Sequence, residues 1–502
     1  MPLKQKKTRK PVLAHANITV VIVLLACGNV VAAPFVSSQN QYLAHALSKA
    51  DTNAANDWFG NTTDPYPLFS EVARLTYGWA GIDGIRIWAL FGTVVAMASV
   101  FFLAHLLAKR TNHSNVPLLG TVMIGLTLLP HTLHAFSGVA SQYIISTPAC
   151  LLPSMFGCFL FLAIPCLFAA QTTKKDTEKR LLATAFILAA LSCMLHPTYI
   201  VSAVMLLAAA FVANIWQGEK AHVLYFVLAA GVLTALTVVA NPALLSMAFS
   251  SPEYSWAAQR FAFERIPHHT RLIFWGRSDI ARFIIAIIAI PIAAKKLNHP
   301  WLAHFLAASV IISTIATLII QLAGQTKLAL LFPWRISVFI MPVSFTIIAV
   351  WIASHIEQMA PLWNWRRVAV VSACCTALYG CIATLQAKSP AESDARTAFV
   401  RAVHPFGVGL VPLDSDNLRL NAPANIYVDW EAPPYASDDL IEWWHRIDQA
   451  RQFERDADRF CSMKWHASIR WILLPAKEKA PSCVSQWKIA GQTKEWRILE
   501  EK

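Results

Sequence analysis

Between two long apolar segments the chain carries the polar stretch QNQYLAHALSKADTNAANDWFGNTTDPYPLFS, residues 39–70. It contains three acids, Asp51, Asp57 and Asp64, and two aromatic residues directly follow Asp57. The apolar runs on either side are about as long as the roughly 20-residue helix that crosses a bilayer. We therefore expect a loop held at a membrane surface, where aromatic rings settle. An ordinary solvated loop is the alternative interpretation.

The composition supports a membrane protein. Of 502 residues, 56% are hydrophobic and 14% are charged, with a mean hydropathy of +0.47. Soluble proteins carry about 25% charged residues. We therefore predict an all-α polytopic transmembrane bundle. In a soluble protein the net charge of +13 would suggest a nucleic-acid partner. Here much of the charge lies in short loops between spans, so it indicates topology and we expect no nucleic acid.

The apolar runs predict about eleven spans. The basic head MPLKQKKTRK precedes the first, which we expect to be retained as a span, since many more follow; a cleaved signal peptide is the alternative. The predicted spans are residues 12–35, 86–108, 115–133, 151–170, 181–197, 199–216, 222–240, 279–297, 300–321, 331–353 and 367–386.

This count gives two domains and a topology. Residues 1–386 form the predicted transmembrane domain, with 36–85 as its first outer loop, and residues 387–502 form a small outer α/β domain. Lysine and arginine are concentrated in the predicted inner segments, as cytoplasmic loops require. We therefore expect a cytoplasmic N-terminus and a C-terminal domain outside the membrane.

The C-terminal domain has its own pattern. Residues 424–430, 469–475 and 487–499 favour strands, and Ser437 opens a helix with an apolar stripe. Its tryptophans, Trp430, Trp443 and Trp444, could stack on sugar rings, although packing in the core is the favoured interpretation. Its only cysteines, Cys461 and Cys483, could form a disulfide in an oxidising compartment.

Cations also occur outside, against the general bias. Four arginines crowd into QRFAFERIPHHTRLIFWGRSD (259–279), among them Arg265 and Arg271, and Arg335 lies in LLFPWRISVFIMP. Arginine forks match phosphate oxygens, so an anionic ligand is one explanation and ion pairing with outer acids is the other. Adjacent His268 and His269 are expected to point to different sides, which makes them a poor pair for one metal.

With these features in place, the layout resembles the GT-C class of membrane glycosyltransferases. More narrowly, ERIPHHTRLIFW, LFPWRISV and YVDWEAPPYASDDLIEWWHRI resemble an uncharacterised bacterial family of polytopic membrane proteins associated with that class. The resemblance implies a bacterial inner-membrane protein, a periplasmic C-terminal domain, a polyprenyl-phosphate-linked sugar donor and a glycan or lipid acceptor. The chain departs from the GT-C acid pair, because its acids are spread as D-x5-D-x6-D.

The resulting hypothesis assigns roles to eight residues. Asp57, or Asp64 as second choice, would be the base; Asp64 could instead shape the loop or hold a divalent metal. The cations expected to bind the donor phosphate are Arg265, His268, His269, Arg271, Lys327 and Arg335. A non-catalytic lipid-glycan transporter or assembly factor, and a metal-free glycan ligase or polymerase, remain as alternatives.

The charge asymmetry gives a first testable prediction. Reporter fusions at about residues 175 and 400 should report opposite sides of the membrane, because the predicted inner segments are the basic ones. Identical signals at the two positions would show that the number of spans between them is wrong.

Overall fold

The structure is a computed structural model. It describes residues 12–29, 35, 39–48, 57–109, 114–129, 134–140, 142–145, 152–218, 223–241, 251–323, 332–360, 364–386, 394–462 and 468–502. Two residues of the sequence hypothesis, Asp51 and Lys327, lie outside these ranges.

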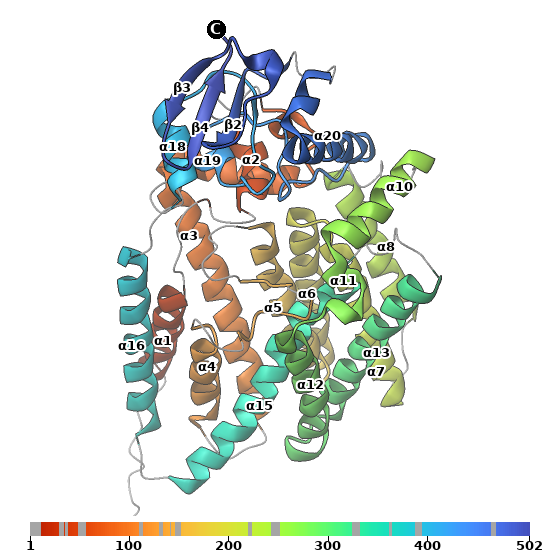
Figure 1. The fold of residues 1–502 in the computed structure, drawn as a ribbon. Helices are drawn as coiled ribbons and strands as arrows, with labels where there is room; N and C mark the ends of the chain where they lie inside the picture. The colour runs from red at the N-terminus through yellow and green to blue at the C-terminus, as the bar shows by residue number, and fades with distance from the viewer. Residues whose placement is uncertain are drawn as a thin grey trace, which may run out of the picture.

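Helices occupy all eleven segments predicted to span the membrane (Figure 1). They are α1 (Val12–Asn29), α3 (Pro67–Ala108), α4 (Val116–Leu126), α5 (Gly157–Ala170), α6 (Lys175–Leu195), α7 (Tyr199–Trp216), α8 (Val223–Ala240), α12 (Arg277–Pro291), α13 (Pro300–Ala323), α15 (Ser337–Met359) and α16 (Trp365–Gln386). Among the described residues, seven helices are long and apolar enough to cross a membrane. The chain is therefore a multi-pass membrane protein, while the count of eleven spans stays a prediction.

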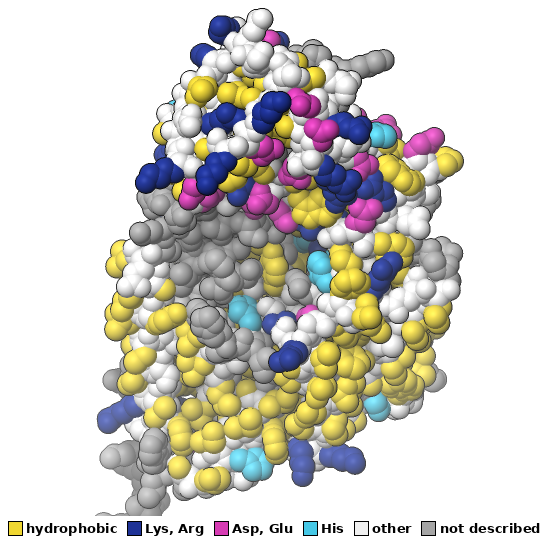
Figure 2. All heavy atoms as spheres, viewed as in Figure 1, with side chains coloured by type: hydrophobic (Ala, Val, Ile, Leu, Met, Phe, Trp, Pro, Cys, Tyr) yellow, Lys and Arg dark blue, Asp and Glu magenta, His cyan; other side chains and the backbone are white. Residues whose placement is uncertain are grey.

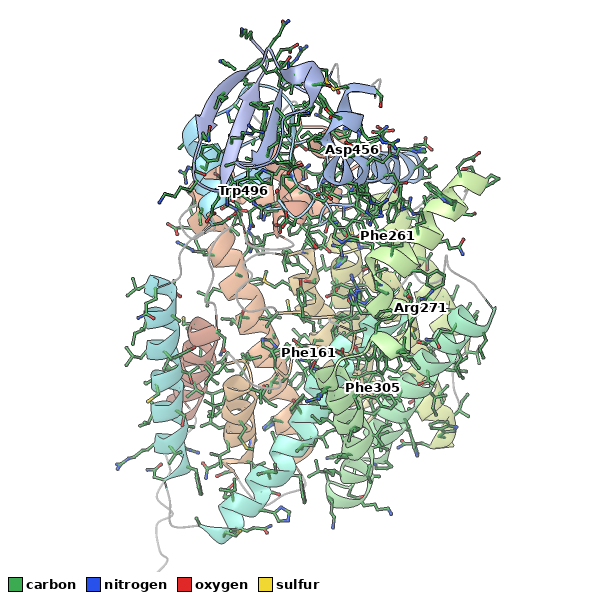
Figure 3. The ribbon with its side chains drawn as sticks, viewed as in Figure 1. Phe161, Phe261, Arg271, Phe305, Asp456 and Trp496 are labelled. Atoms are coloured by element: carbon green, nitrogen blue, oxygen red, sulfur yellow. A yellow bond between two sulfur atoms is a disulfide. The ribbon has the colours of Figure 1, made fainter. Side chains whose placement is uncertain are left out.

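The surface of the bundle agrees with this assignment. Figure 2 shows hydrophobic side chains over the helical part, and charged side chains gathered on the C-terminal part above it. Large apolar residues such as Val239 and Leu322 are more than four-fifths exposed, as residues that face lipid tails would be. Inside, Phe161 and Phe305 are fully buried (Figure 3).

Short helices connect the bundle to the C-terminal domain. The first outer loop forms α2 (Gln39–Ser48) and η2 (Phe59–Asn61). A second outer segment forms α10 (Pro252–Arg260), the π-helical turn η4 (Phe261–Arg265), α11 (Pro267–Thr270) and η5 (Leu272–Phe274). Single turns, η3 (Pro153–Phe156) and η7 (Pro333–Ile336), precede α5 and α15.

The C-terminal domain is a four-stranded sheet with helices. Its sheet has the order β1-β2-β4-β3, in which β1 is parallel to β2 and the other pairs are antiparallel. Its elements are α18 (Ala395–Val403), β1 (Gly409–Leu410), α19 (Leu418–Asn421), α20 (Ser437–Arg455), η8 (Ala457–Ser462), β2 (Trp471–Pro475), η10 (Ser482–Val484), β3 (Lys488–Gln492) and β4 (Trp496–Glu500).

Several expectations for this domain are confirmed and one is wrong. The 469–475 strand and the 437–455 helix are present, Trp443 and Trp444 are fully buried in the core, and Cys461 and Cys483 are bonded. The predicted strand at 424–430 is absent; only Ile426 forms an isolated bridge, to Gly409. Beyond the two backbone bonds that Asn425 and Tyr427 make to Gly409, its N–H groups donate to the Asp57 side chain and to the Leu413 carbonyl, so no ladder forms.

A buried ion-pair group joins the first outer loop to the C-terminal domain. The Nε of Arg419, on α19, donates to Asp57 Oδ1 at 2.9 Å, and its Nη1 donates to Asp429. All three side chains are at most 3% exposed. The backbone N–H of Ile426 also donates to Asp57 Oδ2, at 3.3 Å. Side-chain amides of α2 add to the contact, since Asn40 bonds Asn417 and Gln41 bonds the Pro433 carbonyl.

We expect Arg419→Ala to destabilise the C-terminal domain strongly. The change leaves two carboxylates buried without their cation, which typically costs about 3–5 kcal/mol. Arg470→Ala is the matched control, because the Arg470–Glu501 pair is about half exposed and such pairs contribute roughly 0–1 kcal/mol. Thermal unfolding of the purified protein compares them, and equal small shifts would contradict the assigned role of Arg419.

Candidate functional site

A cationic cavity of about 350 Å³ lies where the helical bundle meets the C-terminal domain. Its described lining comes from the first outer loop, the segments before α5 and α15, the turn between α6 and α7, the α10–α11 segment and residues 431–435. The lining residues are Gln41, Tyr42, Gln142, Tyr143, Ser154, His196, Phe261, Arg265, Ile266, His268, His269, Phe332, Arg335, Glu431, Pro433 and Tyr435. Figure 3 labels Phe261 at the level where the bundle meets α20.

Arg335 is held in the turn η7, directly before α15. It follows Phe332, whose φ of 49° places a non-glycine residue in the left-handed region, a conformation that costs about 1–3 kcal/mol. The guanidinium lies 4.6 Å from the centroid of the Phe332 ring, and its Nη1 donates to His196 Nε2 at 2.6 Å. Its Nε has no hydrogen-bond partner among the described residues. One donor of a buried guanidinium is thus left for a ligand.

The histidines of the cavity are neutral hydrogen-bonding groups. Burial lowers the pKa of His269 well below the ordinary value, and the neighbouring His268 and then Arg335 lower it further. Because Arg335 donates to Nε2 of His196, the ring proton of His196 lies on Nδ1. This nitrogen is 3.2 Å from the Thr198 hydroxyl. His268 also has a lowered pKa, from burial and then from Arg265. The positive charge therefore comes from the arginines.

Arg265 faces the one carboxylate among the described lining residues. Its Nη2 donates to Glu431 Oε2 at 2.6 Å, and its Nε donates to the Trp430 carbonyl at 2.9 Å. The Glu431 side chain is 39% exposed, whereas that of Arg265 is 16% exposed. The pair thus stands at the open part of the cavity with the carboxylate outermost.

The structure brings together four of the predicted phosphate-binding residues: Arg265, His268, His269 and Arg335. Arg271 is a correction, since its guanidinium is exposed, lies 4.4 Å from the Phe263 ring and does not line the cavity. The short helix α11 turns it away, below Phe261 in Figure 3. The expectation that the two histidines diverge is also wrong. Both line the cavity with ring centroids 4.1 Å apart.

The two predicted acids lie beside the cavity and do not line it. Asp57 is 1% exposed, and its oxygens accept from Gly60, Arg419 and Ile426, so its geometry fits the ion-pair alternative. Asp64 accepts from the backbone N–H of Tyr66 at 2.8 Å, which fits a role in shaping the loop. Tyr66 then separates it from the cavity, with its ring 5.1 Å from that of His196.

Sequence reasoning missed Glu431, His196 and the tyrosines. Burial raises the pKa of Tyr42, one of the lining tyrosines, well above the ordinary value, so its phenol stays protonated and can donate. Glu431 lies between Trp430 and Pro433-Pro434, where an acid in an aromatic, proline-rich segment is the only signal. Among the described residues, no group of three or more His, Cys, Asp or Glu side chains could hold a metal.

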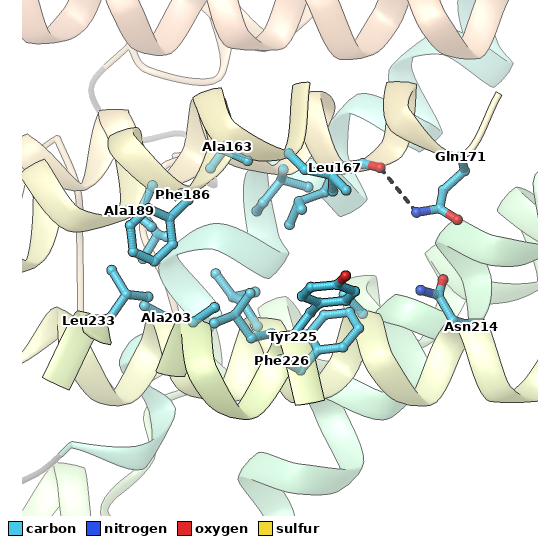
Figure 4. A pocket seen from close by; sticks show the side chains of 18 of the residues that line it. Ala163, Leu167, Gln171, Phe186, Ala189, Ala203, Asn214, Tyr225, Phe226 and Leu233 are labelled. Atoms are coloured by element: carbon cyan, nitrogen blue, oxygen red, sulfur yellow. Dashed lines mark hydrogen bonds between the residues drawn. The ribbon is translucent and has the colours of Figure 1, made fainter. Parts of the chain in front are cut away.

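A second cavity, of about 330 Å³, lies among α5, α6, α7 and α8 (Figure 4). Its lining is apolar, with residues such as Ala163, Phe186 and Leu233, and polar Gln171 and Asn214 lie at one end. It shares no lining residue with the cationic cavity and offers no described cation to an anionic ligand.

Comparison with known proteins gives little further information. No family model matches the chain, and no curated protein matches it. Among solved structures, the crystal structure of ArnT from Cupriavidus metallidurans in the apo state aligns over 97% of each chain, with 11% identity and a TM-score of 0.37. A superposition this loose carries no argument, so the function must be argued from the cavity.

Asp416, beside the cavity, gives a pH prediction. Burial, Asp429 and Glu431 raise its pKa from 3.8 to about 6, so folding favours its protonated form. Its stabilising contribution is complete below pH 3.8 and is lost as pH rises through about 6. We expect Asp416→Asn to raise the midpoint of thermal unfolding at about pH 8 and to change it little at about pH 4.

Asp414→Asn is the control with the opposite sign. The hydrogen bond from Arg396 lowers the pKa of Asp414, so its carboxylate stabilises the fold at neutral pH. If the midpoint of thermal unfolding at about pH 8 falls in both variants, the raised pKa of Asp416 is contradicted.

Proposed function

We propose that this protein is a membrane glycosyltransferase of the GT-C type. It would move a sugar from a polyprenyl-phosphate-linked donor to a glycan or lipid acceptor at the outer face of the membrane. The observation that carries the proposal is the cavity at the junction of bundle and C-terminal domain, which contains two arginines, Arg265 and Arg335. A lipid-borne phosphate reaches this level while its chain stays in the bilayer.

The chemistry follows from the groups in the cavity. Arginine donors offset the charge that develops on a departing phosphate, and neutral histidines and tyrosines add hydrogen bonds without adding charge. His269 is placed for this by Gln142, whose amide nitrogen lies 2.8 Å from the ring Nδ1. The acceptor hydroxyl would enter beside the C-terminal domain, which closes the outer side of the cavity through Glu431, Pro433 and Tyr435.

One observation favours a glycan ligase or polymerase as the second candidate. Arginine and histidine dominate the cavity, and the acids of the first outer loop do not line it. In such an enzyme the outer-loop acid would be dispensable and no metal would be needed. The two candidates share the lipid-phosphate donor and differ in whether a carboxylate is required.

The donor site is tested by Arg335→Gln. The change removes one of the two arginine charges of the cavity, and hydrogen bonds to charged groups contribute about 1.5–3 kcal/mol, so binding of a polyprenyl phosphate should weaken by roughly 10- to 150-fold. Sugar transfer at low donor concentration should fall in parallel. Binding can be measured in detergent with a fluorescent short-chain polyprenyl phosphate.

Arg271→Gln is the matched control, because Arg271 belongs to the same outer surface and does not line the cavity. It should bind the lipid as the wild type does. Equal loss in both variants would indicate nonspecific attraction to a basic surface, and unchanged binding in Arg335→Gln would place the lipid elsewhere.

A further inference from the structure

We propose that Glu431 is a replaceable counter-ion that becomes the proton acceptor of the reaction. Its carboxylate holds Arg265 in the structure; when the donor phosphate takes Arg265, the carboxylate is released toward the acceptor hydroxyl. The inference rests on the proposed function and extends it to a residue of the C-terminal domain.

The geometry of the pair supports the exchange. Only one oxygen of Glu431, Oε2, bonds Arg265, through Nη2 at 2.6 Å, and the glutamate side chain is 39% exposed. Arg265 keeps a separate anchor when the carboxylate leaves, because its Nε donates to the Trp430 carbonyl at 2.9 Å. The arginine can therefore stay in place while its counter-ion changes.

The segment that carries Glu431 is fixed on both sides. The backbone N–H of Trp430 donates to the Leu413 carbonyl at 3.0 Å, and the N–H of Ala432 donates to Asp429 Oδ1 at 2.7 Å. Asp429 is in turn paired with the buried Arg419. Only the side chain of Glu431 is free to rotate between the arginine and the interior of the cavity.

Two of the three cavity histidines already have a hydrogen-bond partner that occupies a ring nitrogen. His196 accepts from Arg335 through Nε2, and His269 lies within hydrogen-bond distance of the Gln142 amide. The phenol of Tyr42 stays protonated, since burial raises its pKa, and is therefore no base. Among the described lining residues, Glu431 is the one carboxylate.

The proposed step balances. The acceptor oxygen forms a bond to the anomeric carbon as the bond from that carbon to the phosphate oxygen breaks. The electron pair of the broken bond leaves with the polyprenyl phosphate, whose charge Arg265 and Arg335 offset. The hydroxyl proton passes to the carboxylate of Glu431. Release from Arg265 leaves Oε2 of Glu431 without that hydrogen bond, so this oxygen can accept the hydroxyl proton.

The test is Glu431→Gln, which keeps the size of the side chain and removes its charge. Without the competing counter-ion, binding of a short-chain polyprenyl phosphate should tighten by about two- to five-fold, the range that a partly exposed ion pair contributes. The kcat of sugar transfer should fall by roughly 10²-fold or more, as expected for loss of a general base. Glu431→Asp, which retains a carboxylate, should restore part of kcat.

Glu442→Gln is the matched control. Glu442 pairs with Arg446 at 2.8 Å in the same domain, is 46% exposed and does not line the cavity, so neither binding nor kcat should change. Unchanged or weaker lipid binding in a folded Glu431→Gln protein would contradict the role of Glu431 as a counter-ion. A retained kcat would contradict its role as the base. A wild-type protein that binds the lipid and transfers no sugar would contradict the proposed function and the role of Glu431 as a base. The lipid affinities of the wild type and Glu431→Gln would still show whether the phosphate displaces Glu431 from Arg265.

Discussion

The pairing of Arg419 with two buried carboxylates is the interaction on which the arrangement of the site depends. Asp57 comes from the first outer loop and Asp429 from the segment before α20, and Arg419 joins them at the inner surface of the C-terminal domain. Charges this deeply buried are stable only as a complete set. The ion-pair group therefore fixes the position of the first outer loop relative to the C-terminal domain. It also fixes the position of Glu431, which follows Asp429 by two residues.

This constraint links two surfaces that form the cavity. The membrane side contributes Arg335, set at the end of a span by a strained Phe332, and the outer side contributes Arg265 and Glu431. A cavity between a membrane bundle and a folded outer domain suits a ligand with an apolar chain and a charged head. The same arrangement explains why aromatic rings surround the arginines: Phe332 and Trp430 cover their faces while the donors stay directed at the cavity.

Much of the fold could be predicted from the sequence, because bilayer thickness dictates the length of apolar segments. Helices lie at all eleven predicted positions, and α20 begins at Ser437, as its pattern indicates. The apolar alternation of residues 424–430 predicts a strand, and the structure has none there. The partners of its N–H groups, such as the Asp57 side chain, are distant in sequence, so the local pattern cannot indicate them. The site was predicted in part: Arg265, His268, His269 and Arg335 come together, but the direction of Arg271 depends on the turn of α11, which no periodicity reports. The position of Asp57 in the first outer loop predicts a catalytic acid. Its burial is explained by its partner Arg419, which is distant in sequence.

The central claim is that the cationic cavity binds the phosphate of a polyprenyl-linked lipid. An experimental structure of the protein with a polyprenyl phosphate tests it most directly. We predict the phosphate within hydrogen-bond distance of both Arg265 and Arg335, with the Glu431 side chain turned away from Arg265. A phosphate bound elsewhere, with the Arg265–Glu431 pair intact, would contradict the account.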